Sequence, residues 1–322
     1  MPTYEPKREH IRAAVESALS QTRSDWILLI NDDASKREDV AAHVEPYLLD
    51  PRIRLERNVQ NLGIGGNWNA CFRQAETPYI AFLFQDDAWD AQYLERMLDA
   101  LEKNPSAGFA ASNHTYIFEG KIRSSPLYEG LQAFREANIT PGLHDHRAFL
   151  RWWMKRGLHP NVIGEPSFVV LRRSLMEEVG PFNASMFQFL DCEYWMRCLL
   201  KADWYYVAEP LGQFRVHGEG MSAVNERAGR SIAERLITLE IAVASLPPED
   251  KAEGRKAIVG ALAEMIGKFF TRTKAGKPVG SKAKGEVRKF VLRHPFLTGR
   301  AAFAALWKSM RTGQRKAGRR SE

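Results

Sequence analysis

The sequence predicts an α/β protein with a mostly parallel β-sheet, helices on both faces of that sheet, and a helical, basic C-terminal region. Continuous apolar runs at residues 25–31 and 79–84 have the pattern of strands buried on both faces. Segments with helical spacing of apolar residues follow these runs, and this alternation favours a parallel sheet. From about residue 226 the strand patterns stop and helical, Lys/Arg-rich sequence takes over.

The first elements follow in order along the chain. Residues 9–20 repeat apolar positions at helical spacing, and the run at 25–31 then predicts a strand. That strand ends at "DDAS" (32–35), after which helix signals continue to about residue 48. An alternating strand at 52–56 and a turn-rich segment precede a helix at 67–75.

The middle of the chain continues the alternation. We expect a second buried strand at 79–84, a clear amphipathic helix at 91–103 and a third strand at 107–112. Residues 113–165 are less regular, and 167–183 read as a strand, a helix and a stop at "GPFN".

The last elements are mainly helical. An amphipathic helix at 191–202 is followed by two short strands up to residue 222. Helical stretches at 226–245 and 249–271 then lead to a basic, Gly-containing linker at 273–286. We expect three parts: a first domain over residues 1–225, a helical extension over 226–272, and a basic linker and tail over 273–322.

Charge divides the chain into two regions. Residues 226–322 hold 22 Lys and Arg against 9 Asp and Glu, whereas residues 1–225 hold 24 against 30. The three cysteines lack metal-type spacing and predict reduced thiols of a cytosolic protein. Because no apolar run approaches the ~18–20 residues of a membrane span, we expect a soluble or surface-attached chain.

The basic tail admits three interpretations. It can be a solvated end, an attachment to an anionic membrane surface, or a nucleic-acid contact. No recognition motif accompanies the charge, so we expect no nucleic acid as partner. The membrane interpretation depends on apolar residues interleaved with Lys and Arg. These are Phe290, Leu292, Phe296, Leu297, Phe303 and Trp307.

Two acidic pairs stand where predicted strands end. Asp32 and Asp33 follow the run at 25–31, and Asp86 and Asp87 follow the run at 79–84. Because ligands of parallel sheets bind beyond the carboxyl ends of the strands, both pairs are expected on one rim of one sheet. Adjacent carboxylates repel one another, and a bound cation would relieve that repulsion.

Several of these segments together resemble the family 2 glycosyltransferases with the GT-A (Rossmann-like) fold, over residues 2–222. The matching segments are "PTYE" (2–5), "ALSQTRSDWILLINDDAS" (18–35), "NLGIGGNWNA" (61–70), "YIAFLFQDDAW" (79–89), "VGPFN" (179–183), "DCEYWMR" (191–197) and "FRVHGEGMS" (214–222). In two places the sequence departs from the family pattern. The complete first strand that normally precedes "PTY" is expected to be missing, and Gln85 occupies a position that is often acidic.

The resemblance implies a divalent metal site, filled by Mg²⁺ or Mn²⁺, that holds the diphosphate of a nucleotide-sugar donor. It assigns Asp87 to the metal, with Asp86 contacting the ribose or assisting. His217 is implied as a further metal ligand or as a contact to the diphosphate. Such hard oxygen anions suit an ion held by few carboxylates, with phosphate oxygens and water completing its shell.

The resemblance also implies a nucleotide pocket. Asp33 would hydrogen-bond the base and Tyr4 would stack on it or line its pocket, with Asp32 as the alternative to either. Capping of a following helix by the "DDAS" segment is the competing interpretation. Asn61 and Asn69 supply amides that can bind sugar or phosphate.

The catalytic carboxylate of the family corresponds to Asp191, and Glu193 matches a second acidic position. As a general base, Asp191 would take the proton of an acceptor hydroxyl and allow a single displacement with inversion. A helix N-cap is the alternative role for Asp191. Trp152 or Trp153 could stack on an acceptor sugar or pack in the core.

The sequence therefore predicts an inverting, metal-dependent, hexosyltransferase-type enzyme. Its acceptor would be a saccharide or lipid-linked saccharide, used in surface polysaccharide or glycolipid assembly, in the cytoplasm or at the inner face of the membrane. A nucleotidyltransferase also uses acidic rims on α/β sheets but needs a Gly-rich, basic phosphate loop that this sequence lacks. A non-catalytic nucleotide- or glycan-binding protein with a degenerate site is the other alternative.

Overall fold

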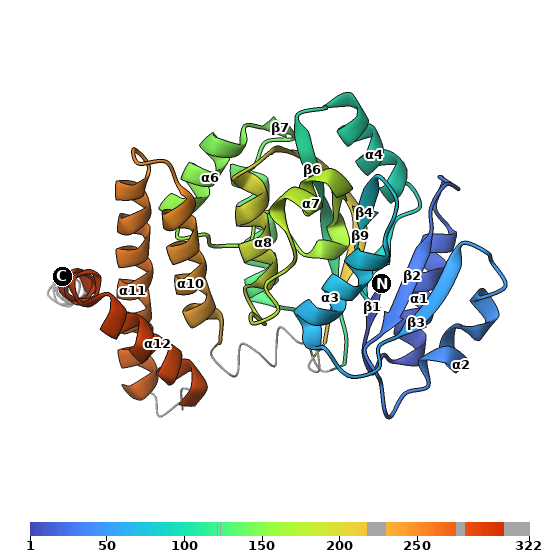
Figure 1. Ribbon diagram of the computed structural model, residues 1–322, viewed down its shortest axis with the longest axis horizontal. Helices are drawn as coiled ribbons and strands as arrows, with labels where there is room; N and C mark the ends of the chain where they lie inside the picture. Colours follow the sequence, from blue (N-terminus) through green and yellow to red (C-terminus); the bar gives the residue numbers. More distant parts are fainter. Residues whose placement is uncertain (121, 123, 218–229, 275–280, 306–322) are drawn as a thin grey trace, which may run out of the picture. The chain divides into compact units, whose positions relative to one another are not determined.

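The computed structural model describes residues 1–120, 122, 124–217, 230–274 and 281–305 (Figure 1). The chain forms two compact units. The first comprises residues 1–150 and 160–220, and the second comprises residues 151–159 and 221–322. The predicted α/β class and the predicted C-terminal helices are confirmed. The division at residues 225 and 272 stays a prediction.

The first unit contains a small parallel sheet with β2 at its centre. Its strands are β1 (Pro2–Thr3), β2 (Leu28–Asp32) and β3 (Ile53–Arg57). Pro2 pairs with Asn31 and Thr3 with Asp32. Helices α1 (Arg8–Leu19) and α2 (Val40–Val44) join their apolar side chains with those of β2 and β3 in one buried cluster (Figure 1). This cluster fixes the ends of β1 and β2.

A second, larger sheet carries the remaining strands in the order β4-β8-β6-β9-β5, with β7 paired to β9. Their bounds are β4 (Tyr79–Ala81), β5 (Ala88–Trp89), β6 (Ala107–Phe118), β7 (Gly142–His144), β8 (Val169–Arg172) and β9 (Asp203–Val216). The prediction of a mostly parallel sheet is wrong. β6 and β9 are parallel, but β8 runs antiparallel to both β4 and β6, and β5 and β7 run antiparallel to β9.

The physical reason is that hydrophobic periodicity records burial and not strand direction. The strands of the predicted alternation, β4 and β6, share a direction because each is antiparallel to β8 between them. The opposing strands β5, β7 and β8 arise outside that alternation. The expectation that both acidic pairs lie on one sheet is likewise wrong, since β2 and β4 belong to different sheets.

Further helices follow or connect these strands, and they belong to the first unit except for residues 151–155, which belong to the second. They are α3 (Gly63–Gln74), α4 (Tyr93–Lys103), α5 (Pro126–Asn138), α6 (His146–Lys155), α7 (Arg173–Val179) and α8 (Leu190–Leu199), with short 3-10 turns at Glu45–Tyr47 and Pro166–Phe168. The predicted helix after "DDAS" begins only at Val40, because Asp39 accepts the Ala42 N–H as its N-cap. The segment predicted to be less regular, 113–165, contains α5, β7 and all of α6.

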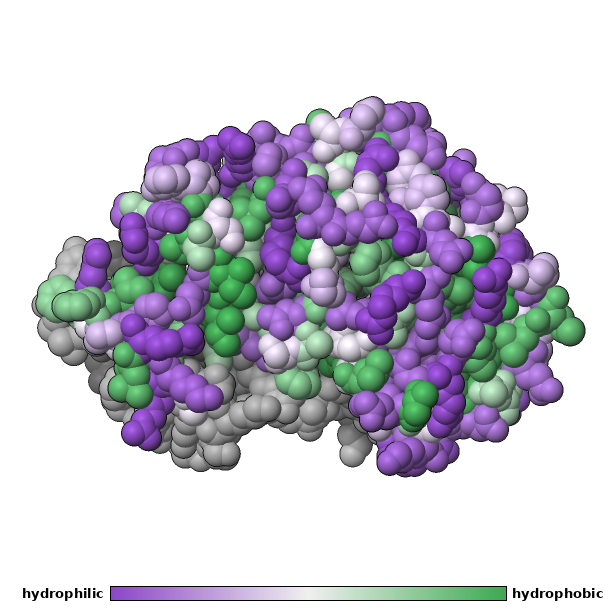
Figure 2. Space-filling model, in the orientation of Figure 1, coloured by the Kyte–Doolittle hydropathy of each residue, from purple (hydrophilic) through white to green (hydrophobic). Residues whose placement is uncertain are grey.

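The second unit is helical where it is described, with α10 (Arg230–Ser245), α11 (Lys251–Lys274) and α12 (Ser281–Arg293). Leu236, Leu239 and Leu262 are buried between α10 and α11. None of the helices in the described ranges is long and apolar enough to cross a bilayer. The face seen in Figure 2 mixes hydrophilic residues with separate hydrophobic patches.

Candidate active site

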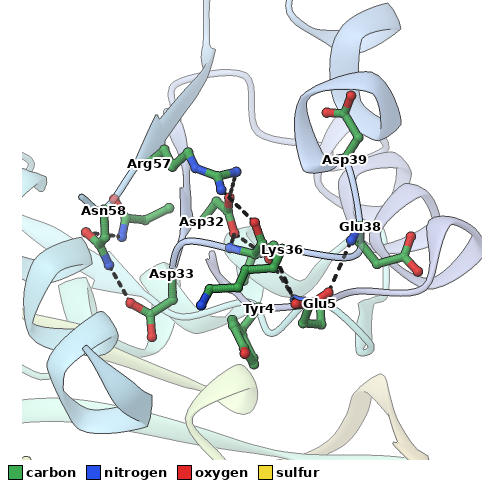
Figure 3. Close-up of polar contacts among 12 residues, drawn as sticks. Tyr4, Glu5, Asp32, Asp33, Lys36, Glu38, Asp39, Arg57 and Asn58 are labelled. Carbon is green, nitrogen blue, oxygen red and sulfur yellow. Dashed lines mark hydrogen bonds and ion pairs between the residues drawn. The ribbon is translucent and has the colours of Figure 1, made fainter. Parts of the chain in front are cut away.

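The loop after β2 is fixed by Asp32 (Figure 3). One Asp32 oxygen accepts the Ser35 N–H at 3.1 Å and the Ser35 hydroxyl at 2.6 Å, and the other accepts Arg57 Nη1 at 2.6 Å. The Asp32 side chain is 2% exposed. Both Asp32 carboxylate oxygens therefore accept bonds that fix the loop and attach it to β3.

Glu5 holds the same loop from the other side. Its carboxylate accepts backbone N–H groups of residues 36, 37 and 38 at 2.9–3.3 Å, as Figure 3 shows in part. Burial raises the pKa of Glu5, but these backbone donors outweigh burial and the net pKa is lowered. Glu5 adopts a left-handed backbone with φ 46°, which is uncommon outside glycine. The contacts and the backbone conformation of Glu5 also fix the backbone of the preceding residue, Tyr4.

Asp33 joins the rim of β2 to the start of α3. Its oxygens accept Asn58 Nδ2 at 2.8 Å, the Leu62 N–H at 2.8 Å and the Gly63 N–H at 2.9 Å. Asn61 donates its side-chain amide to the Asp33 carbonyl at 3.1 Å. Capping of the following helix by "DDAS" is not found, because Asp39 caps α2, whereas Asp33 accepts the first backbone N–H groups of α3. Its predicted contact to a nucleotide base stays a prediction.

Tyr4 and Gln85 connect the two sheets. The Tyr4 N–H donates to Gln85 Oε1 at 2.8 Å, and Gln85 Nε2 donates back to the Tyr4 carbonyl at 3.1 Å. The Tyr4 ring is 47% exposed and points away from Asp32 and Arg57 in Figure 3. The ends of β1 and β4 therefore meet through these contacts, although they belong to separate sheets. Gln85, which replaces an often acidic residue, makes this connection.

Asn69 is bound to the backbone of Phe182. Its amide donates to the Phe182 carbonyl at 2.9 Å and accepts the Phe182 N–H at 2.8 Å. Both ends of the Asn69 side chain therefore attach α3 to the loop before α8. Its predicted contact with sugar or phosphate would require breaking this pair.

Asp87 is almost completely buried, with 1% of the residue exposed. Ser167 Oγ donates to one of its oxygens at 2.6 Å and the Arg215 N–H donates to the other at 3.1 Å. Burial and the neighbouring charge of Asp86 raise the pKa of Asp87. No described Lys or Arg makes an ion pair with Asp87, so its charge has no cationic partner in this part of the chain.

Asp86, rather than Asp87, faces His217. The distance from Asp86 Oδ2 to His217 Nε2 is 3.0 Å, and both side chains are partly exposed. Arg215 Nε donates to the Asp86 carbonyl at 3.0 Å, which ties β9 to the acidic turn. A carboxylate and an imidazole that converge from segments 131 residues apart are a donor set that suits Mn²⁺.

This pair alone does not surround an ion. Within the described ranges no group of three or more His, Cys, Asp or Glu side chains is arranged to hold a metal. Mg²⁺ and Mn²⁺ sites that carry substrate phosphates often use only one or two carboxylates, with phosphate oxygens and water as the other ligands. The residues present therefore fit an ion that arrives with a diphosphate.

Sequence reasoning missed two residues beside this pair. His10 Nε2 lies 2.9 Å from Glu119 Oε1, and Glu119 also lies 3.3 Å from Arg215 Nη1. The His10 ring centroid is 5.7 Å from that of His217. Glu119 thus holds Arg215, and His10 flanks His217. Their only sequence signal is polar character, His10 in a helix and Glu119 directly after a strand, and neither position carries a motif.

Asp191 lies in the first turn of α8. Asn161 Nδ2 donates to Asp191 Oδ2 at 2.8 Å, and the Cys192 N–H donates to Oδ1 at 2.7 Å. The residue keeps partial exposure, yet burial raises its pKa from 3.8 to about 7, and Glu165 adds to the rise. A carboxylate with a pKa near 7 suits a general base at neutral pH.

Glu165 links the two acidic positions electrostatically. Its charge raises the pKa of Asp191 and also that of Asp87. Ser167, two residues further along, donates to Asp87, and Asn161 in the same loop donates to Asp191. The loop 161–167 therefore brings the acidic turn after β4 and the start of α8 to one region of the first unit.

Glu193 and the tryptophans take structural positions. Glu193 is 2% exposed and makes two bonds to Arg197, at 2.7 and 2.9 Å. Arg197 also holds the carbonyls of residues 179 and 181. Trp153 is fully buried, and the Arg156 guanidinium lies 4.2 Å from the centroid of Trp152.

Residues 1–162 match glycosyl transferase family 2, which is half of the chain. The chain belongs to glycosyl transferase family 2.

Curated relatives agree with this membership. An uncharacterized protein MT1568 of Mycobacterium tuberculosis is 27% identical over 62% of this chain and 61% of its own length. The E. coli UDP-Glc:alpha-D-GlcNAc-diphosphoundecaprenol beta-1,3-glucosyltransferase WfgD is 35% identical over 38% of this chain and 47% of its length. The E. coli K12 putative colanic acid biosynthesis glycosyl transferase WcaA is 30% identical over 39% and 44%. The matches span less than two thirds of each of these relatives.

Solved structures share the fold. Staphylococcus aureus TarS 1-349 in complex with UDP-GlcNAc superposes with a TM-score of 0.58 at 15% identity, over 82% of this chain and 70% of that one. The mannosyltransferase PcManGT of Pyrobaculum calidifontis, in complex with GDP-Man and Mn²⁺, gives 0.56 at 16% identity, over 95% and 86%. At these identities the likeness shows the GT-A fold alone.

Proposed function

We propose that this chain transfers a sugar from a nucleotide-diphosphate sugar to a hydroxyl group of a saccharide acceptor, with inversion at the anomeric carbon. The observation that carries the proposal is Asp191, a partly exposed carboxyl group whose pKa is raised to about 7. Structural carboxylates normally acquire a partner that stabilises their charge, and Asp191 has no ion-pair partner among the described residues.

The chemistry at Asp191 is a single displacement. The acceptor oxygen forms a bond to the anomeric carbon while the bond from that carbon to the diphosphate oxygen breaks. The electron pair leaves on the diphosphate, and the hydroxyl proton passes to Asp191. Asn161 keeps the carboxylate oriented through its bond to Oδ2. No covalent sugar–enzyme intermediate is needed, and the product therefore has the inverted configuration.

Asp86 and His217 are proposed to hold Mg²⁺ or Mn²⁺. The buried carboxylate of Asp87, next to Asp86, would add negative charge close to the ion. Relative to the sequence prediction, this exchanges the roles of the two aspartates, because Asp86 is the one that faces His217. When bound, the ion would neutralise the departing diphosphate. Arg215 would keep the acidic turn in place through its contacts to Asp86 and Asp87.

The donor pocket is proposed at the rim of the small sheet. The exposed Tyr4 ring would lie against the base, and Asp33 and Asn61 would border it. The base itself is proposed to be uracil or guanine, since structures of the same fold contain UDP-GlcNAc and GDP-Man.

The acceptor is proposed to be a lipid-linked saccharide in surface polysaccharide assembly. The printed names of relatives mention a diphosphoundecaprenol acceptor and colanic acid biosynthesis. The basic C-terminal region would then contact the anionic inner face of a membrane from the cytoplasm. Of the apolar residues predicted for this contact, Phe296 and Phe303 are exposed, Phe290 is 2% exposed and packs on His294, and Trp307 lies outside the described residues.

The test is a screen of UDP- and GDP-sugars with Mn²⁺, measuring donor hydrolysis and donor-induced thermal stabilisation. We expect one donor to stabilise the wild type. Asp191→Asn should keep that stabilisation and lose turnover by about 10²–10⁴-fold, the usual contribution of a general base. Asp99→Asn is the matched control, since Asp99 is a surface residue paired with Lys103. Unchanged turnover in Asp191→Asn would defeat the assignment.

A further inference from the structure

Several buried polar atoms around Glu165, whose charge raises the pKa of Asp191, lack a hydrogen-bond partner among the described residues. They are Arg135 Nη2, Glu165 Oε2, the Tyr116 hydroxyl and both ring nitrogens of His114. Most buried polar groups in folded proteins are paired, so unpaired ones require an explanation. Their concentration in one cluster indicates that a ligand supplies the missing partners.

Arg135 is a fixed donor in this cluster. It lies on α5 and is 1% exposed. Its Nε donates to the Val162 carbonyl at 3.0 Å and its Nη1 donates to Asn113 Oδ1 at 3.2 Å. These two bonds fix the orientation of the guanidinium, and Nη2 remains available to donate to a ligand. Gly164, with φ 112°, makes room for it, because a Cβ there would lie 3.3 Å from Nη2.

Glu165 supplies the complementary acceptor. Its Oε2 lies 3.2 Å from His114 Nε2, at ion-pair distance but without hydrogen-bond geometry, and its side chain keeps 16% exposure. Burial raises the pKa of Glu165, but His114 and Arg135 outweigh burial and the net pKa is lowered. Burial lowers the pKa of His114. An ionised Glu165, a neutral His114 and a cationic Arg135 leave no net charge.

Half-buried aromatic rings border these polar atoms. The ring centroids of Tyr116 and Tyr128 lie 4.9 Å apart, and Phe214 lies 6.1 Å from the first and 5.8 Å from the second. Tyr116 and Phe214 are register partners on β6 and β9. Aromatic faces beside donors and acceptors suit an amphipathic ligand, with C–H groups on the rings and hydroxyls on the polar atoms.

We propose that Tyr116, Arg135 and Glu165, bordered by Tyr128 and Phe214, form the acceptor subsite and select a neutral saccharide. One hydroxyl of the sugar accepts from Arg135 Nη2 and a neighbouring hydroxyl donates to Glu165 Oε2. Glu165 shares a loop with Asn161, which holds Asp191, so the bound sugar lies beside the base. This inference rests on the proposed function and specifies its acceptor class.

The test compares two tyrosines that both have an unpaired buried hydroxyl. Tyr116→Phe removes one beside His114 in the proposed subsite, and Tyr93→Phe removes one on α4, where Tyr93 stacks on Trp89. Neither change removes a hydrogen bond of the free protein, so both variants should fold. Glu165→Gln is a second variant of the subsite. The probes are neutral methyl glycosides of glucose, galactose, mannose and N-acetylglucosamine, with methyl glucuronide as the anionic probe.

Binding of each probe is titrated by NMR with UDP or GDP and Mn²⁺ present. We expect a neutral glycoside to bind the wild type, and its Kd to rise about tenfold in Tyr116→Phe and Glu165→Gln but not in Tyr93→Phe. Preference for the glucuronide, equal affinity in all variants, or no glycoside binding would overturn the subsite. Failure of the proposed function would instead show as absent nucleotide binding in the wild type, measured in the same samples.

Discussion

The raised pKa of Asp191 predicts that Asp191→Asn stabilises the protein at alkaline pH. The folded-state pKa of about 7 exceeds the ordinary value of 3.8. In the pH window between these values the folded chain binds more protons than the unfolded chain, so stability falls as pH rises. Above pH 7 the full cost of the charged carboxylate is present. The neutral, isosteric Asn does not incur it.

The magnitude follows from the same shift. Three pKa units correspond to about 4 kcal/mol, and partial exposure of Asp191 makes this an upper bound through solvent screening. Asn offers one acceptor where Asp offers two, so the bond from Asn161 or from the Cys192 N–H is lost, at about 1–2 kcal/mol. The net gain is about 2 kcal/mol at pH 8.5. At pH 5.5, which lies between the two pKa values, about half of this cost is present and roughly offsets the lost bond, so the variant and the wild type should have about equal stability.

The assay is thermal unfolding of wild type, Asp191→Asn and Asp99→Asn at both pH values. A gain of this size raises the Tm by about 3 °C at pH 8.5 for a chain of 322 residues. Asp99 lies on the surface and Lys103 lowers its pKa, so its variant should change little at either pH. A Tm difference for Asp191→Asn that does not grow between pH 5.5 and 8.5 would refute the reasoning.

Three further outcomes are expected. Glu165→Gln removes a charge that raises the pKa of Asp191, so the acid limb of the kcat–pH profile should move below its wild-type position near pH 7. His217→Ala should weaken Mn²⁺-dependent donor binding at least tenfold by calorimetry, while metal-free nucleotide binding changes less. Glu193→Gln breaks a buried ion pair with Arg197 and should lower the free energy of unfolding by about 3–5 kcal/mol, measured by denaturant unfolding at neutral pH. The fraction of this variant that folds should keep the donor affinity of the wild type.

The sequence predicted the elements whose burial is periodic. The helix at 91–103 matches α4, and the helix predicted from residue 191 begins at Leu190. The acidic turns were predicted because a strand end followed by Asp-Asp is a local pattern. Strand direction and the separation of the two sheets could not be predicted, because neither one changes the periodicity of the apolar residues.

The partners of the site residues could not be predicted for a related reason. Asp86 and His217 are 131 residues apart, and the sequence around each residue contains no pattern that predicts its contact with the other. Glu165 stands alone before a proline in a segment without periodicity. One signal was present for the proposed subsite, because "SNHT" (112–115) places polar residues directly after an apolar run, and polar residues buried in a strand require partners.

The carboxylates of the first unit fall into two groups that differ in their electrostatic partners. Asp32 and Glu193 are buried with an arginine, and each one holds a loop or helix in place. Asp87 is buried and Asp191 is partly exposed, and both have raised pKa values and no described cationic partner. In the function that we propose, the donor brings a cation close to Asp87 and the acceptor hydroxyl gives its proton to Asp191. Binding of either ligand should therefore stabilise the fold. The absence of a described counter-charge, rather than acidic character alone, is thus the reason for proposing Asp87 and Asp191 as site residues.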